Sequence, residues 1–224
     1  MSDVKITIDG REVAAKEGEI LLFRALEEGF YIPHLCAIEG LDPPQGSCRL
    51  CFVELEGRSD PVTSCTVRVT DGMSVRTRTD AVDRLVRSAF EMLMSVHRLD
   101  CKVCPANKNC ALQEIAKQRK LPLKPGRLAK IEPDFPIDES REEIGLNPNR
   151  CVLCGRCIHV CNEVVKKGVL DFTRRSLSMA VSTFDGEPLA DQVCGDCVAC
   201  AEVCPVGAIY FRDENRQRSK AEGE

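Results

Sequence analysis

Fifteen cysteines among 224 residues are the side chains of this sequence best suited to chemistry. Eight of them form two runs with one spacing, CVLCGRCIHVC at residues 151–161 and CGDCVACAEVC at residues 194–204. In each run, gaps of two, two and three residues separate four cysteines. Thiols so close in sequence crowd around one centre, whereas zinc prefers separated C-x2-C pairs. Crowded runs of this kind are typical of ligands to iron–sulfur clusters.

The repeat predicts two [4Fe–4S] clusters that share ligands between the runs. In the two-cluster ferredoxin arrangement, three cysteines of a run bind one cluster and the fourth binds the other cluster. The second run ends Cys204–Pro205, as this motif does, whereas the first ends Cys161–Asn162, a change in the flanking turn and not in a ligand. The expected ligand sets are Cys151, Cys154, Cys157 and Cys204 for one cluster, and Cys161, Cys194, Cys197 and Cys200 for the other.

A second group of four cysteines, nearer the N-terminus, has wider spacing. Gaps of eleven, two and thirteen residues separate Cys36, Cys48, Cys51 and Cys65. Plant-type ferredoxins hold a [2Fe–2S] cluster with a C-x4-C-x2-C…C pattern, and here the first gap is longer. We favour a [2Fe–2S] cluster at these four residues. Zinc is the alternative, because the thirteen-residue gap also suits a zinc site.

The three remaining cysteines lie in HRLDCKVCPANKNC, residues 97–110. Three thiolates do not complete a tetrahedral set, but the neutral imidazole of His97 does. The predicted ligands of a third [4Fe–4S] cluster are therefore His97, Cys101, Cys104 and Cys110. This stretch alone also suits a structural zinc site made of three cysteines and one histidine. His34 and His159 lack a spare set of partners, so we interpret them as loop residues near clusters, with His159 a polar neighbour of one.

Turn residues and alternating hydrophobicity predict a small α+β domain of the β-grasp type at residues 1–78. VKITIDGREVAA alternates around Asp9–Gly10, which predicts a hairpin, and residues 19–28 show the periodicity of a helix that ends at Gly29. After a loop that contains prolines, CFVELEG and VTSCTVRVTDGMSVRT alternate as strands around a second turn at Asp71–Gly72.

Helical periodicity resumes at Asp80 and ends near His97, and a short helix follows Cys110. Residues 79–121 are therefore expected to form a small helical module that holds His97 and the three cysteines after it. Residues 122–141 form a linker with several prolines, across which the charge changes from basic to acidic. We interpret it as a solvated connector, with a docking strip for a partner as the alternative.

The two runs lie in a third module, residues 142–212, which resembles a two-cluster bacterial ferredoxin in its cysteine spacing. A pair of strands is expected between the runs, at residues 166–193, with a turn at Asp185–Gly186. The charged tail, residues 213–224, is expected to be disordered.

Composition excludes several classes of function. A formal net charge of −4 without a concentrated basic patch argues against nucleic-acid binding. No apolar run reaches the roughly 18 residues needed to span a bilayer. The start MSDVKITIDG lacks the features of a signal peptide, and an odd number of closely spaced cysteines argues against disulfides. We therefore expect a cytoplasmic protein with reduced thiols.

The order of these motifs resembles the N-terminal electron-transfer region of a known family. Its members are the large peripheral subunit of NADH:quinone oxidoreductase (complex I), iron-only hydrogenases, and the electron-transfer subunits of NAD-linked nickel–iron hydrogenases and related formate dehydrogenases. The resemblance covers residues 1–212, and it implies iron rather than zinc at His97, Cys101, Cys104 and Cys110. Many members have HPLDCPVC where this chain has HRLDCKVC, so that Arg98 and Lys102 replace prolines.

Within that family, complex I relatives generally lack the full pair of runs and continue into a large domain, and iron-only hydrogenases continue into a catalytic domain. This chain has both runs and stops after them. The resemblance therefore favours the separate diaphorase-type subunit of an NAD(P)-linked hydrogenase, electron-bifurcating ones included. The equivalent subunit of a formate dehydrogenase or another complex I-like oxidoreductase is the alternative.

The chain has no G-x-G-x-x-G turn for a dinucleotide and no spare ligands for a catalytic metal, so we expect a non-catalytic subunit. We expect it to pass single electrons through one [2Fe–2S] and three [4Fe–4S] clusters. Its expected partners are a flavoprotein subunit that binds FMN and NAD(P), and a catalytic hydrogenase or formate dehydrogenase subunit. A zinc-stabilised interaction scaffold and a freestanding polyferredoxin-like carrier are the alternatives.

Overall fold

The computed structural model describes residues 2–132 and 134–212, and the chain divides into two compact units. Of the described residues, 2–92 form the first unit, and 93–132 and 134–212 form the second. The division falls inside the long helix α2 (Asp80–Val96), which the sequence predicts from its apolar stripe. The boundaries expected after residues 78, 121 and 141 stay predictions.

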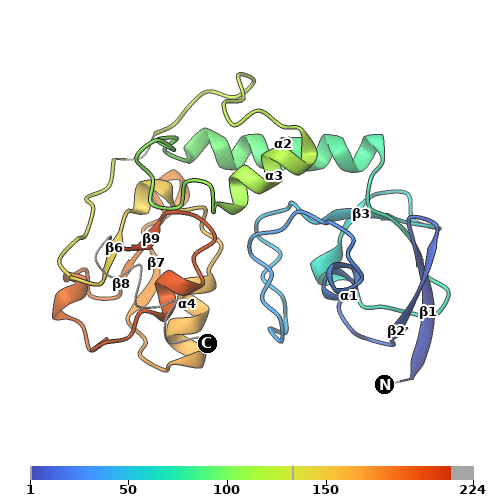
Figure 1. The fold of residues 1–224 in the computed structure, drawn as a ribbon, viewed down its shortest axis with the longest axis horizontal. Coiled ribbons are helices and arrows are strands. Elements are labelled where there is room, and N and C mark those ends of the chain that lie inside the picture. Colours follow the sequence, from blue (N-terminus) through green and yellow to red (C-terminus); the bar gives the residue numbers. More distant parts are fainter. Residues whose placement is uncertain (1, 133, 213–224) are drawn as a thin grey trace. The chain divides into compact units, whose positions relative to one another are not determined.

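A five-stranded sheet forms the first unit; its strands are β1 (Asp3–Ile8), β2 (Arg11–Lys16), β3 (Phe52–Leu55), β4 (Val62–Thr63) and β5 (Ser74–Arg76). Their order in the sheet is β2-β1-β5-β3-β4. Figure 1 labels β1, β2 and β3 of this sheet. β1 and β2 form the predicted hairpin, in which Asp9 and Gly10 have φ of 48° and 83°. β5 pairs parallel with β1, so the sheet is mixed.

The core of the first unit lies between this sheet and helix α1 (Leu21–Glu27). The alternation in β1 buries Val4, Ile6 and Ile8 on one face, as a half-buried strand requires. Leu21, Leu22 and Ala25 of α1 are buried in the same core cluster. Cys51 and Cys65 belong to that cluster too, so two predicted ligands lie in the core of the domain.

The strand predicted to run from residue 62 up to the turn at Asp71–Gly72 is interrupted. β4 contains only two residues, and a 3-10 turn, Ser64–Thr66, follows it directly. The turn forms because the backbone N–H and the hydroxyl of Ser64 both donate to the carbonyl oxygen of Cys51, each at 2.9 Å. The interruption brings Cys65 close to Cys51, which a continuous strand would not do.

Helix α2 begins after Thr79, whose hydroxyl oxygen accepts from the Val82 N–H at 3.2 Å. Asp80 and Asp83 lie in its first turn, where acidic side chains are favourable. The second predicted helix is α3 (Ala111–Arg119), which begins directly after Cys110 and ends at Lys120 in the left-handed conformation. The two helices therefore bracket the stretch His97 to Cys110, as the sequence indicates.

The second unit contains two small antiparallel sheets and two short helices beyond α3. One sheet pairs β6 (Ile144–Leu146) with β9 (Ile209–Phe211), and the other pairs β7 (Leu170–Thr173) with β8 (Ala180–Thr183). The short helices are α4 (Arg156–His159), which continues into a π-helical turn at Val160–Val164, and α5 (Ala199–Glu202). The paired strands at residues 166–193 are thus confirmed.

Two local predictions in this unit are wrong. The connection between β7 and β8 is residues 174–179, in which Arg174 and Ser176 have positive φ, and not the predicted turn at Asp185–Gly186. Asp185–Gly186 does form a turn, but it follows β8, where the Gly186 N–H donates to the Thr183 carbonyl. His159 was expected in a loop and lies in α4, because the left-handed Gly155 begins the helix earlier.

The predicted linker is attached to the second unit at several points. The ammonium group of Lys130 donates to the carbonyl oxygens of Met94 and His97, and the Ile131 N–H donates to the Ser95 carbonyl at 2.8 Å. Farther on, Asp138 and Leu146 exchange backbone hydrogen bonds of 2.9 and 2.8 Å. These contacts make Lys130, Ile131 and Asp138 part of the unit. The tail predicted to be disordered, residues 213–224, lies outside the described residues.

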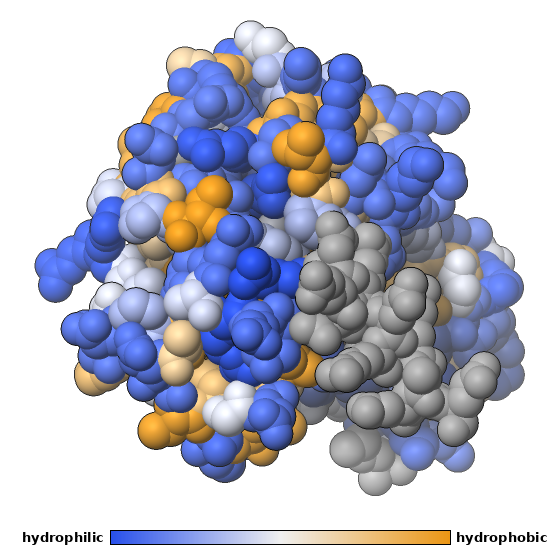
Figure 2. Space-filling model, turned by 60° about the vertical axis from the view of Figure 1, so that its left-hand side comes forward, coloured by the Kyte–Doolittle hydropathy of each residue, from blue (hydrophilic) through white to orange (hydrophobic). Residues whose placement is uncertain are grey.

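Over the part of the chain that the structure describes, no helix is both long and apolar enough to cross a bilayer. The face drawn in Figure 2 is mostly polar, with small and separate apolar patches. Exposed apolar side chains include Val103, Phe184 and Val193, of which Val103 lies between two predicted cluster ligands in the sequence.

Candidate cluster sites

The structure brings the four cysteines of the first unit into one buried group. Each of them is at most 7% exposed. The Cys48 N–H donates to the sulfur of Cys36 at 3.4 Å. Cys65 faces Cys51 across the Ser64 turn, and the charges of Cys36 and Cys48 act on it as well. The predicted [2Fe–2S] ligands are therefore neighbours in space.

These thiols interact as two hydrogen-bonded pairs. A hydrogen bond from the Cys48 thiol lowers the pKa of Cys36 to about 5, and one from the Cys51 thiol lowers the pKa of Cys65. The same bonds, with burial, raise the pKa of Cys48 and of Cys51. The lowered pKa of Cys36 and of Cys65 favours the thiolate, which is the form that binds metal.

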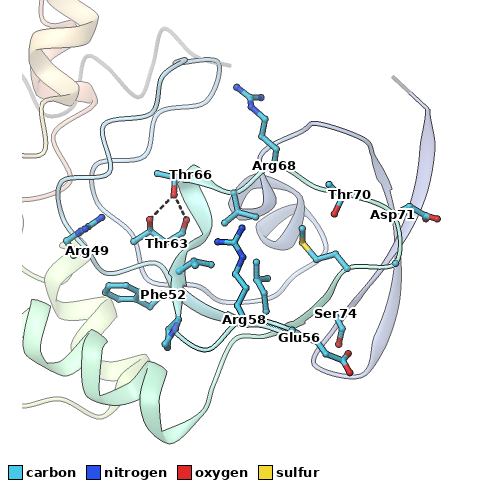
Figure 3. Close-up of a pocket in the computed structure, with 17 residues that line it drawn as sticks. Arg49, Phe52, Glu56, Arg58, Thr63, Thr66, Arg68, Thr70, Asp71 and Ser74 are labelled. Atoms are coloured by element: carbon cyan, nitrogen blue, oxygen red, sulfur yellow. Dashed lines mark hydrogen bonds between the residues drawn. The ribbon is translucent and has the colours of Figure 1, made fainter.

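A pocket of the first unit is a separate feature. It is an open groove of about 900 Å³ on the side of β3, β4 and β5, and its lining contains no cysteine or histidine (Figure 3). Arg49, which lies between Cys48 and Cys51 in the sequence, is at one end of the groove in Figure 3, near Phe52. The groove therefore borders the cluster loop without containing a candidate ligand.

His97 follows the last residue of α2 and is 7% exposed. Burial, and then the charge of Lys130, lowers its pKa to about 4, so the imidazole is neutral near pH 7. Its Nδ1 atom is buried without a hydrogen-bond partner in the structure. A buried polar atom left unpaired costs about 1–3 kcal/mol, and a bound metal ion removes that cost. The residue fits the role of a neutral metal ligand.

Cys101, Cys104 and Cys110 are half-buried neighbours of one another. The Cys104 N–H donates to the Cys101 carbonyl at 3.4 Å. Burial raises the pKa of Cys110, and the charges of Cys104 and Cys101 raise it further. The link to His97 runs through Arg150, whose backbone hydrogen-bonds to His97 and whose guanidinium interacts with Cys104. The structure thus gathers the three thiols and connects His97 to them through Arg150.

The first run and Cys204 surround one apolar cavity. Its lining includes Cys151, Cys154, Cys157 and Cys204, together with apolar residues such as Val152, Val181 and Ile209. Burial raises the pKa of Cys151 to about 12, and the charges of Cys154 and Cys204 act in the same direction. The N–H groups of Leu153 and Ile209 donate to the sulfurs of Cys151 and Cys204, at 3.3 and 3.4 Å. Four cysteines around an apolar cavity, with N–H groups that donate to two of their sulfurs, fit a cluster.

The second run gathers around Cys161 of the first run. Burial raises the pKa of Cys200 to about 12, and the charges of Cys194, Cys197 and Cys161 raise it further. The Val169 N–H donates to the sulfur of Cys161 at 3.3 Å. The structure therefore groups each run of three with the fourth cysteine of the other run. Which atoms bind iron stays a prediction.

Other residues around these thiols were not identified from the sequence. Arg141 is buried and donates to the Cys197 carbonyl at 3.0 Å, and the Asp100–Arg150 ion pair lies beside Cys104. A Cβ atom built on Gly207 would lie 2.5 Å from the sulfur of Cys104.

His34 bonds to the Ile32 carbonyl at 2.9 Å and stays a loop residue. Among residues 2–132 and 134–212, no group of three or more His, Cys, Asp or Glu side chains has an arrangement that could hold a single metal ion.

Three family models match consecutive parts of the chain. The 2Fe-2S iron-sulfur cluster binding domain matches residues 2–80, and the NADH-ubiquinone oxidoreductase-G iron-sulfur binding region matches residues 87–121. The ferredoxin-like domain of NADH-quinone oxidoreductase subunit 3 matches residues 142–210. Fold, thiol groups and matches together define an iron–sulfur protein with one 2Fe–2S domain and 4Fe–4S regions.

Solved and curated relatives extend this result over nearly the whole chain. A chain of the crystal structure of NAD+-reducing [NiFe]-hydrogenase in the H2-reduced state is 30% identical, with a TM-score of 0.82 over 94% of this chain and 88% of that one. The alpha subunit of an NADPH-Fe(3+) oxidoreductase from Geobacter sulfurreducens is 35% identical over 93% of this chain and 24% of its own length. Subunit HndD of the NADP-reducing hydrogenase of Solidesulfovibrio fructosivorans is 35% identical over 93% of this chain and 36% of its own length.

The chain belongs to the family of iron–sulfur electron-transfer subunits found in NAD(P)-linked hydrogenases and related oxidoreductases. It spans about a quarter to a third of the length of these two curated relatives. The paired runs fall in a region matched by a domain model of NADH-quinone oxidoreductase subunit 3, and the separation of this chain from complex I relatives stays a prediction.

Proposed function

We propose that this chain passes single electrons between an FMN- and NAD(P)-binding flavoprotein subunit and a catalytic hydrogenase subunit in the cytoplasm. The observation that carries the proposal is the crossed grouping of the eight paired-run cysteines around two buried centres. Such a pair of neighbouring centres suits one-electron transfer. The equivalent subunit of a formate dehydrogenase or another complex I-like oxidoreductase is the second candidate.

The proposed cofactors are one [2Fe–2S] cluster and three [4Fe–4S] clusters, which supply reversible one-electron chemistry when bound. The ligands are the sixteen side chains grouped above. The four buried cysteines of the β-grasp domain, residues 1–78, hold the [2Fe–2S] cluster. His97 and three cysteines of residues 79–121 hold one [4Fe–4S] cluster, and residues 142–212 hold two more. The buried, neutral imidazole and the N–H groups directed at sulfur support these assignments.

The partners are proposed from the relatives. The matched structure is of an NAD+-reducing [NiFe]-hydrogenase, and HndD is a subunit of an NADP-reducing hydrogenase. Hydride exchange with a nicotinamide needs a flavin or similar acceptor that takes two electrons. A chain of one-electron centres therefore needs a flavoprotein on one side and a catalytic metal subunit on the other.

The iron content of the anaerobically purified chain tests the proposal. One [2Fe–2S] and three [4Fe–4S] clusters predict about 14 irons and as many acid-labile sulfides per chain. Electron paramagnetic resonance of the reduced protein will show signals of both cluster types. A preparation with stoichiometric zinc, little sulfide and no reducible signal would instead identify a zinc-stabilised scaffold.

The isolated chain is expected to take electrons from dithionite but not from NADH or NADPH. The reason is that the proposed clusters accept one electron each and cannot accept hydride. Dye reduction by NAD(P)H will appear only when the flavoprotein partner is added. Steady NADH-dependent dye reduction by the flavin-free chain alone would contradict the proposed role. Purification of the native chain without any other subunit would favour a freestanding carrier.

A further inference from the structure

A bidentate ion pair joins the segment of His97 to the start of the first cysteine run. The guanidinium of Arg150 donates to both carboxylate oxygens of Asp100, with Nη2–Oδ2 at 2.6 Å and Nε–Oδ1 at 2.9 Å. The Arg150 side chain is 8% exposed and that of Asp100 is 28% exposed. A buried cation is costly unless it is paired, so this geometry fixes the positions of both charges.

The two charges lie between two of the proposed clusters. Asp100 precedes Cys101, a proposed ligand of the His97 cluster, and Arg150 precedes Cys151, a proposed ligand of the next one. Arg150 also interacts with Cys104. Cys104 in turn lies against the turn after Cys204, where a Cβ on Gly207 would clash with its sulfur at 2.5 Å.

Backbone hydrogen bonds hold the same two segments together. The Arg98 N–H donates to the Asn149 carbonyl, and the Ala111 N–H donates to the Pro205 carbonyl, each at 2.9 Å. The first bond lies directly before Arg150 in the sequence and the second directly after Cys204. These bonds hold the two segments together, so Asp100 and Arg150 cannot readily move apart.

We propose that Asp100 and Arg150 act in opposite directions on the reduction potential of the His97 cluster, so that each charge compensates for the other. The inference rests on the proposed function. Reduction adds one electron to the cluster and breaks no bond, so a nearby positive charge favours the reduced form and a nearby negative charge opposes it. Each charge, with its partner in place, offsets the other, and the potential reflects their balance.

Charge-neutral variants of the pair test this directly in the full chain. Potentiometric titration followed by electron paramagnetic resonance will show a lower midpoint for the His97 cluster in Arg150→Gln and a higher one in Asp100→Asn. The double variant will lie near the unchanged protein. We expect each single change to alter the ratio of reduced to oxidised cluster about tenfold at a fixed potential, equivalent to about 59 mV for one electron.

The control is Arg58→Gln, which removes an exposed arginine of the first unit and leaves all midpoints unchanged. Unchanged midpoints in both single variants with full iron and sulfide, or shifts of the same sign in both, would overturn the inference. If the Arg150→Gln variant does not retain the His97 cluster, the midpoint of this cluster in Asp100→Asn is the test. A raised midpoint supports the inference, and an unchanged midpoint overturns it. Absence of iron from the unsubstituted chain would instead overturn the proposed function.

Discussion

Replacing Cys204 with serine is expected to damage the cluster held by the first cysteine run, although Cys204 belongs to the second run in the sequence. The structure groups its sulfur with Cys151, Cys154 and Cys157 around one apolar cavity. A serine oxygen is a poor substitute for a thiolate ligand, so iron will fall by up to about four atoms per chain if the cluster is lost. Iron analysis and electron paramagnetic resonance of the reduced protein measure the change.

The matched control is Cys200→Ser, in the same run and four residues earlier. Cys200 interacts with Cys194, Cys197 and Cys161, so this variant is expected to alter the other cluster. If the two substitutions alter different electron paramagnetic resonance signals, the result will support the arrangement in which each run supplies its fourth cysteine to the other cluster. If both substitutions alter only the centre of Cys194, Cys197 and Cys200, the ligands do not cross between the runs.

Gly207→Ala is expected to disturb the His97 cluster although it leaves every proposed ligand residue unchanged. The added Cβ would lie 2.5 Å from the sulfur of Cys104 and 3.4 Å from the Cβ of Ala106, so Cys104 or the turn after Cys204 must move. Overpacking of this kind costs about 1–3 kcal/mol. The expected result is partial loss of the His97 cluster signal and a lower unfolding temperature of the holoprotein.

Gly126→Ala is the matched control. Gly126 has open space at its Cβ position and no positive φ, so the substitution is expected to change neither the signal nor the unfolding temperature. Equal behaviour of the two variants would show that the turn after Cys204 yields easily and that the contact with Cys104 has no consequence for the cluster.

Patterns within short segments predicted much of the fold. Alternation around Asp9–Gly10 indicated the first hairpin, and the apolar stripe from Asp80 indicated α2, because each depends on neighbouring residues only. The grouping of Cys161 with the second run and of Cys204 with the first was predicted from spacing. Identical spacing in both runs constrains how two adjacent centres share thiols.

Contacts between distant segments could not be predicted from these patterns. Asp100 and Arg150 are separated by fifty residues, and neither spacing nor periodicity pairs them. The close approach of Gly207 to Cys104 depends on packing in the second unit and has no signature in the sequence. The position predicted for the turn at Asp185–Gly186 was wrong for a different reason. This pair of residues favours a turn, but the local sequence does not determine whether the turn joins the two strands or follows the second one.

The contacts of Lys130 have a consequence for how this chain tolerates change in length. Its ammonium group binds carbonyl oxygens at the C-terminal end of α2, where the helix dipole is negative, and one of these carbonyls belongs to His97 itself. Residues 122–129 therefore span between two fixed points, α3 and Lys130, rather than between independent domains. An insertion there only lengthens a surface loop, whereas a deletion long enough to draw Lys130 away would remove the cation that caps α2 beside the imidazole. Evolution and protein engineering can thus add residues to this segment more freely than they can remove them.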